Sequence, residues 1–197
     1  MKALKYFVVL FSFLGFLLAG CSEESQSPVS SIEKGSLEKD KKNVEYTFTS
    51  APEPFTANPS DYMKIAGGAL HLKNYPVTDI ISATDSRVSG RMEHVLSLKL
   101  DVITGEGPCH GEFILTPTDF AATGGGVWEG TYEGLRSKTD DPYVFMLPLK
   151  LVAHGKGGTI DGMQGFMKAD LVVITNDVYY PLPIYWTATG TGVIKEH

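Results

Sequence analysis

Cysteine is scarce in this chain, which has only Cys21 and Cys109 among its 197 residues. Because two cysteines cannot form a disulfide framework, packing and hydrogen bonds must hold the folded part together. Cys21 is assigned to lipid attachment below, which leaves Cys109 as a single thiol. A lone thiol can be catalytic or regulatory. Because free cysteine is commonly a small buried hydrophobic residue, we expect that structural role for Cys109.

Motifs of the common hydrolases, zinc proteases and nucleotide-binding proteins are also missing. The chain has no Gly-x-Ser-x-Gly and no His-Glu-x-x-His, and no lysine follows the glycines at 124–126 as it would in a phosphate-binding loop. The densest reactive cluster is Cys109-His110-Gly111-Glu112. In a strand, His110 and Glu112 project from one face and Cys109 from the other, so the three cannot ligate one metal ion without a bulge. His110 and Glu112 are a candidate polar site or an ordinary surface pair. We expect no metal and no cofactor.

No apolar run is long enough to span a membrane. The longest lies over residues 6–18, after Lys2 and Lys5, and ends at Leu18-Ala19-Gly20-Cys21. A spanning helix needs about 20 apolar residues, whereas a basic start, a short apolar run and a small-residue exit are typical of a signal peptide. The last four residues match the lipobox of bacterial lipoproteins. We therefore predict that residues 1–20 are a lipoprotein signal peptide and that Cys21 carries diacylglycerol and a further acyl chain such as palmitate.

This anchor predicts a location in the bacterial cell envelope. Two or three acyl chains give stable attachment, so the membrane is the first expected partner. Ser22 follows Cys21 where inner-membrane lipoproteins carry aspartate, which favours the outer membrane and leaves its periplasmic or surface face open. Loss of residues 1–20 removes two lysines and no acid, so the net charge changes from −6 to −8. Nucleic acid is not an expected partner, because binding it requires clustered basic residues.

Composition divides the mature chain into two parts. Residues 21–43 are rich in Ser, Glu and Lys and have few branched apolar residues. Such a segment buries too little surface to offset its ordering entropy, and we predict a flexible polar tether. Apolar and polar residues alternate over 44–49, which predicts a first strand there, and residues 44–197 should form a single domain. The proline-rich segment 51–61 within it is expected to be a loop or a covering arm.

Helical periodicity is missing from this domain. Strand-like patterns instead recur over residues 69–82, 88–103, 109–116, 127–136, 143–153, 166–174 and 184–194, and Pro76 should mark a bulge or break. Short turns rich in Gly, Asp and Pro join most of them, which favours an antiparallel up-and-down meander. A meander of this length removes its edges by closing on itself. We predict an all-β fold, a barrel of about eight strands whose interior holds side chains or one small ligand.

Three motifs resemble the allene oxide cyclase-like, calycin-type β-barrel families, in which similar segments occur in the same order. They are Asp85-Ser86-Arg87-Val88-Ser89-Gly90, Gly125-Gly126-Val127-Trp128-Glu129-Gly130-Thr131 and Gly162-Met163-Gln164-Gly165-Phe166-Met167-Lys168-Ala169. The likeness covers residues 66–195 and implies a calycin-like barrel. We expect Trp128 to be a large core anchor and Glu129, on the opposite face, to be able to line a site. The plant enzymes act on an unsaturated epoxide in an apolar cavity, and no catalytic residue carries over to this chain.

The last predicted strand begins in an aromatic and proline-rich segment, residues 179–186. Aromatic side chains offer large contact area at low entropic cost, so Tyr180, Tyr185 and Trp186, with Glu129, are candidate ligand residues at the barrel mouth; packing is the alternative. The sequence predicts a lipid-anchored protein that binds a small apolar ligand or a protein partner. A cyclase or isomerase, and a structural lipoprotein with a filled barrel, are the alternatives. A ligand-sized cavity would favour the binding protein or the enzyme, and a filled interior would favour the structural lipoprotein.

Overall fold

The computed structural model describes residues 42–175 and 183–197. Its strands are β1 (Asn43–Pro52), β2 (Met63–Ala66), β3 (Ala69–Ala83), β4 (Gly90–Asp101), β5 (Gly107–Pro117), β6 (Val127–Lys138), β7 (Val144–Lys156), β8 (Gln164–Thr175) and β9 (Pro183–Lys195). One short helix, α1 (Phe120–Thr123), and two 3-10 turns, η1 (Pro59–Tyr62) and η2 (Gly158–Ile160), connect them. Within these ranges no helix has the length and apolarity that crossing a membrane would require.

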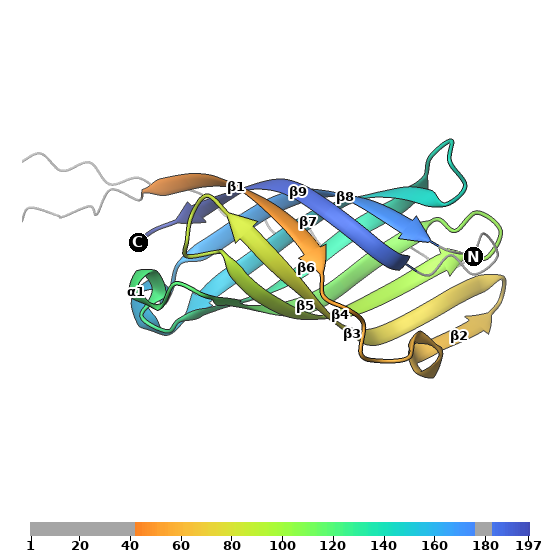
Figure 1. The fold of residues 1–197 in the computed structure, drawn as a ribbon, viewed down its shortest axis with the longest axis horizontal. Coiled ribbons are helices and arrows are strands. Elements are labelled where there is room, and N and C mark those ends of the chain that lie inside the picture. The colour runs from red at the N-terminus through yellow and green to blue at the C-terminus, as the bar shows by residue number, and fades with distance from the viewer. Residues whose placement is uncertain (1–41, 176–182) are drawn as a thin grey trace, which may run out of the picture. The chain divides into compact units, whose positions relative to one another are not determined.

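The strands form one antiparallel sheet that closes into a barrel (Figure 1). Its order is β1-β9-β8-β7-β6-β5-β4-β3-β2, and β1 also pairs with β3, from Phe48 opposite Ala83 to Pro52 opposite Asp79. Eight strands therefore close the barrel, and β2 is an additional strand in a hairpin with β3. The predicted all-β class, meander and closure at eight strands are confirmed.

Alternation along each strand places the core inside the barrel. On β8, for example, Met167, Ala169, Leu171 and Val173 are buried, whereas the intervening residues are exposed. The same period of two on the other strands directs leucine, valine and aromatic side chains inward and most charged side chains outward. The sequence does not predict β2, because three of its four residues are exposed and show no alternation.

Glycines on the inner face make room for aromatic rings on the neighbouring strand. The described residues include four such cross-strand pairs: Tyr46 opposite Gly192, Phe48 opposite Gly190, Phe113 opposite Gly130 and Tyr132 opposite Gly111. A Cβ atom added at Gly130 would lie 2.6 Å from Cζ of Phe113. Glycines within strands were predicted to mark bends or close approach of another group. At these four positions the group that approaches the glycine backbone is an aromatic ring from the next strand.

The irregular part of β3 lies close to the predicted break. The register between β3 and β4 shifts between Leu72 and Tyr75, and Asn74 has a φ of 54°. Asparagine tolerates this left-handed conformation better than most residues. Its backbone N–H donates to Oγ of Ser97, at 3.1 Å. Pro76 continues the strand opposite Val95, so the bulge precedes the proline that was expected to mark it.

The segment between β1 and β2 is a covering arm. Pairing of β1 ends at Pro52 opposite Asp79, and the chain then crosses between β9 and the first half of β3. The ring of Phe55 lies 5.4 Å from that of Trp186 on β9 and 6.0 Å from that of Tyr75 on β3, centroid to centroid. The hydroxyl of Tyr75 donates to the carbonyl of Ala57, at 2.9 Å. Side-chain packing by the arm thus covers the barrel where strand pairing stops.

Candidate ligand site inside the barrel

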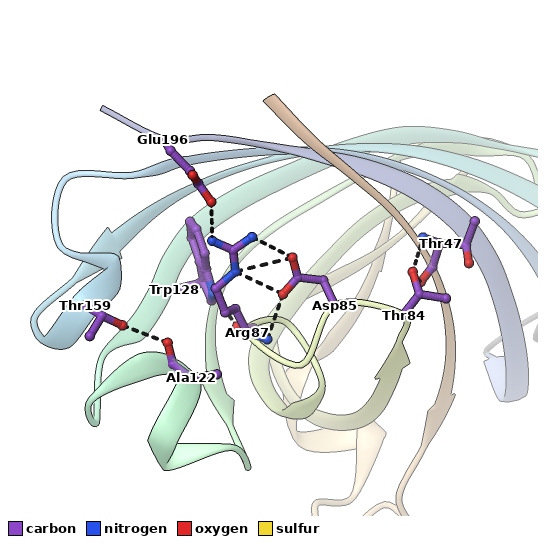
Figure 2. A network of polar contacts seen from close by, with 8 residues as sticks. All are labelled: Thr47, Thr84, Asp85, Arg87, Ala122, Trp128, Thr159 and Glu196. Atoms are coloured by element: carbon purple, nitrogen blue, oxygen red, sulfur yellow. Dashed lines mark hydrogen bonds and ion pairs between the residues drawn. The ribbon is translucent and has the colours of Figure 1, made fainter. Parts of the chain in front are cut away.

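The three family-like motifs meet at one end of the barrel, where Trp128 is almost fully buried. Figure 2 shows the side chain of Trp128 beside the loop that carries Arg87; its indole N–H donates to the Arg87 carbonyl, at 2.8 Å. Gly165, from the third motif, faces the same ring, and an added Cβ would lie 3.6 Å from it. The expected role of Trp128 as a core anchor agrees with this packing, and we name this end of the barrel the Trp128 end.

An ion-pair cluster connects the same loop to the end of the chain. The guanidinium of Arg87 donates to both carboxylate oxygens of Asp85, with distances of 2.7 to 3.3 Å, and to Oε1 of Glu196, at 2.5 Å (Figure 2). Hydrogen bonds from Arg87 hold the pKa of Asp85 below its usual value, against the opposing effect of burial. The first motif therefore stabilises the Trp128 end, which accounts for its charged residues without a catalytic role.

The residues predicted at the barrel mouth are not brought together. Trp186 points into the barrel and is buried, whereas Tyr185 points outward and is 44% exposed. Tyr180 lies outside the described residues. Glu129 is on the outer face, opposite His154 of β7. Of this set, Trp186 alone is placed by the structure inside the barrel.

The outer face carries the other predicted polar residues. His110 and Glu112 are exposed and project outward from β5, and Cys109 projects inward, as the alternation predicts. Glu112 and Glu129 line an open groove of about 750 Å³ that also includes His154, Lys156 and the arm residue Phe55. The described residues contain no group of three or more His, Cys, Asp or Glu side chains arranged to hold a metal ion.

A buried polar cluster inside the barrel was not predicted from the sequence. Asp79 of β3, His94 of β4, Tyr132 of β6 and Trp186 of β9 all occupy inward positions, and the side chains of Asp79 and His94 are each 6% exposed. The four strands place them beside one another in a mostly apolar interior. Buried polar groups cost free energy unless they are hydrogen-bonded, so each of these contacts matters.

Hydrogen bonds connect the four side chains. The indole N–H of Trp186 donates to the Asp79 carboxylate, at 3.1 and 3.3 Å from its two oxygens. Nδ1 of His94 lies 2.9 Å from the Tyr132 hydroxyl, which itself donates to the carbonyl of Val95, at 3.1 Å. Nε2 of His94 lies 3.6 Å from Oδ2 of Asp79, too far for a hydrogen bond, and has no hydrogen-bond partner among the described residues. Burial raises the pKa of Tyr132, so its hydroxyl stays protonated.

Two adjoining cavities are lined by members of this cluster. The first, of about 50 Å³, is lined by all four of its residues together with Cys109, Arg136 and several leucines. The second, of about 40 Å³, shares Asp79 and Met92 with the first and contacts Ser50 and Tyr46. The Ser50 and Tyr46 hydroxyls are buried and have no partner among the described residues. Both cavities are well below the roughly 300 to 1,000 Å³ of drug-sized ligand pockets.

Two further groups set the electrostatics of the first cavity. Burial raises the pKa of the Cys109 thiol to about 12, which keeps it protonated and agrees with its expected structural role. Arg136 is buried with its guanidinium 3.8 Å from the centroid of the Phe145 ring. Burial lowers the pKa of Arg136 to about 10, so it still carries a positive charge at neutral pH.

The alternation itself contained a signal for the interior cluster. Asp79 is in phase with Val77 and Ile81, and His94 is in phase with Met92 and Leu96, so both had to face the core once the strands were assigned. Their separate strands gave no indication that they meet, because strand register and closure decide which inward residues are neighbours.

Comparison with sequence-family models, curated proteins and solved structures finds no match to this chain.

Proposed function

We propose that this chain is a lipid-anchored protein of the bacterial cell envelope, of calycin-like type, whose barrel binds a small ligand in its interior. The lipobox that ends at Cys21 supports the anchor. One observation supports the binding site: polar side chains from four strands converge on one cavity in a mostly apolar interior, and a second cavity adjoins it at Asp79. Convergent polar groups in an apolar cavity are the usual means by which proteins orient a small ligand.

The energetics of the cluster favour a use beyond packing. Leaving a buried polar group without a partner costs about 1 to 3 kcal/mol. Nε2 of His94 and the hydroxyls of Ser50 and Tyr46 are in this position among the described residues. Apolar side chains fill most of the other inward positions, and a purely structural barrel would gain stability from apolar residues here as well. A ligand that hydrogen-bonds these atoms would recover the free energy.

Cavity volume limits the ligand to a few non-hydrogen atoms, or to a narrow molecule that extends through both cavities. Met92 contributes to both linings. Methionine is unbranched and adapts readily to a bound group. A shift of the Met92 side chain would therefore change the shape of both cavities without a change in the strands.

Native mass spectrometry of the protein purified from its own host, in detergent, tests this proposal. We expect a bound small molecule that is lost on unfolding. The Asp79→Asn variant should carry less of it, and the outward Asp170→Asn variant on β8, which removes the same charge, should retain it. A protein that is free of small molecules in every preparation would contradict interior binding.

A structural lipoprotein with a filled barrel is the second candidate, and the small cavity volumes favour it. In that case the hydrogen bonds among Asp79, His94, Tyr132 and Trp186 serve to fix the packing. The native mass spectrum separates the two, because a filled barrel carries no small molecule.

A protein partner is supported by the outer groove. Its lining holds the carboxylates of Glu53, Glu93, Glu112 and Glu129 but only Arg91 and Lys156 as full cations. Arg91 is already paired with Glu53 and Glu93. A basic protein surface would complement the remaining charge. Cross-linking in the native envelope, compared between the wild type and a Glu112→Gln, Glu129→Gln variant, tests this candidate.

A cyclase or isomerase is the remaining alternative, and the short distances among His94, Tyr132 and Asp79 favour it, because all three are acid-base side chains. Conversion of the co-purifying molecule on incubation with the protein would distinguish catalysis from binding.

A further inference from the structure

We propose that the interior site takes the primary ammonium group of a small amine, hydrogen-bonded to both Asp79 and His94. This inference rests on the proposed function, because it specifies which chemical class of ligand the same site accepts. Three observations support it: the direction of the hydrogen bonds at His94, the sparse neutralisation of Asp79, and the gap between the two side chains.

The hydrogen bonds around Tyr132 determine where His94 carries its proton. The Tyr132 hydroxyl has one proton and the carbonyl of Val95 can only accept, so both contacts are hydrogen bonds when the hydroxyl donates to Val95 and its oxygen accepts from Nδ1 of His94. A neutral His94 therefore has its proton on Nδ1 and a lone pair on Nε2. Nε2 faces Asp79 and has no hydrogen-bond partner among the described residues, so it is an acceptor directed at the gap.

The Asp79 carboxylate is a second acceptor at the same place. A carboxylate offers about four acceptor positions, and the side-chain bond it receives comes from the single indole N–H of Trp186. A buried carboxylate needs a nearby positive charge or several donors to remain ionised. Trp186 supplies one neutral donor, which leaves Asp79 suited to a cation.

The gap itself fits a group with several donors. Nε2 of His94 and Oδ2 of Asp79 are 3.6 Å apart, so a nitrogen atom beside them can lie within hydrogen-bond distance of both. The cavity of about 50 Å³ has room for roughly three to five water-sized groups. A primary ammonium offers three N–H donors and a positive charge, and the rings of Trp186 and Tyr132 in the same lining favour a cation. Carboxylate and imidazole acceptors, by contrast, repel an anionic ligand.

Arg136 lies in the same lining and opposes a cation, so its position matters. It follows Tyr132 by four residues on β6, which corresponds to about 13 Å along the strand. Its guanidinium lies over the ring of Phe145, the residue opposite Lys138 near the far end of β6. The ammonium is therefore expected on the Asp79 side of the cavity, and the carbon chain of the amine toward the leucines between them.

The two tryptophans give a direct readout. In a ¹H–¹⁵N correlation spectrum of the ¹⁵N-labelled protein, the Trp186 indole reports on Asp79, and the Trp128 indole, bonded to Arg87 at the Trp128 end, is an internal control. Titration with ethylammonium should shift the Trp186 resonance to saturation and leave that of Trp128 unchanged. Ethanol and acetate, of similar size, should leave both unchanged at the same ionic strength.

Matched variants locate the effect. Asp79→Asn should weaken ethylammonium binding about tenfold or more, since a charge-assisted hydrogen bond is lost, and Asp170→Asn should not change it. An unchanged Trp128 resonance shows that a variant is folded. If Asp79→Asn does not fold, the comparison of ethylammonium with ethanol and acetate in the wild type decides.

Each remaining outcome overturns the amine assignment. Equal shifts with ethanol would show a small-ligand site without selectivity for amines, which leaves the proposed function in place. Absence of a Trp186 shift with ethylammonium would show that His94 and Asp79 satisfy each other, as a protonated His94 would. Native mass spectrometry tests the proposed function independently of the amine assignment, because it detects a bound molecule of any class.

Discussion

At the scale of single residues, the same side-chain type has opposite roles at different depths. The carboxylate of Asp85 lies at the Trp128 end, where Arg87 neutralises it with hydrogen bonds of about ideal length. The carboxylate of Asp79 lies deep in the barrel and receives one neutral N–H. Since Asp85 is bonded to a cation and Asp79 to a single neutral donor, Asp85 is a stabilising residue and Asp79 is the candidate for binding.

The Arg87→Gln variant tests the stabilising role. Loss of the guanidinium leaves Asp85 and Glu196 without their shared cation, so we expect the free energy of unfolding to fall by about 1 to 3 kcal/mol at neutral pH. The measurement is urea unfolding followed by tryptophan fluorescence. An outward Lys168→Gln variant on β8 is the control and should change stability by less than about 0.5 kcal/mol.

Acid should reduce the effect of Arg87→Gln. The pKa of Asp85 is lowered in the folded state below its usual 3.8. Its contribution to stability is therefore present above 3.8 and is lost as the pH falls through the lower folded value. The stability difference between wild type and Arg87→Gln should be constant from neutral pH to about 5 and shrink below about 4. A difference that stays constant in acid would show that the ion pair is not its source.

At the scale of elements, paired glycines and aromatic residues explain how a narrow barrel holds large rings. A ring on one strand lies across the glycine opposite, where a side chain would occupy the same space. This arrangement compensates for the strand propensity that glycine lacks. It also explains why segments such as 188–193, with two glycines among threonines, form a regular strand.

The Gly130→Ala variant tests this packing. The new Cβ would lie 2.2 Å from the Val152 carbonyl oxygen and 2.6 Å from Cζ of Phe113, both of which would have to shift. Overpacking of this kind costs about 1 to 3 kcal/mol. Thermal unfolding followed by circular dichroism measures it, with the neighbouring outward Thr131→Ala as control. If the two variants lower the unfolding midpoint equally, the ring of Phe113 does not depend on Gly130.

At the scale of the whole molecule, a single covalent modification is expected to decide location. Cys109 is buried inside the barrel, so Cys21 is the cysteine available for acylation in the proposed lipoprotein. We expect Cys21→Ser to abolish labelling with radioactive palmitate and to move the protein from the membrane to the aqueous fraction. Cys109→Ser should stay labelled and membrane-bound. Persistent membrane attachment of Cys21→Ser would contradict the anchor.

The strand order could be predicted because each step depends on local chemistry. Alternation identified all eight barrel strands to within a few residues, and short turns forced sequential strands to pair. The candidate site could not be predicted in the same way. The densest reactive segment in the sequence, Cys109-His110-Gly111-Glu112, directs neighbouring side chains to opposite faces of β5, and Glu129 also faces outward.

The sequence by itself therefore determined the fold class, the eight-stranded meander and the predicted lipid anchor, because alternation, turn residues and the lipobox are each read within a few residues. Only the tertiary structure decided that Asp79, His94, Tyr132 and Trp186 meet in one buried cluster, and that the interior around them is nearly filled. The physical reason is that closure of the barrel brings β9 close to β3, on either side of β1. Which inward residues then become neighbours depends on the register of every strand pair around the barrel.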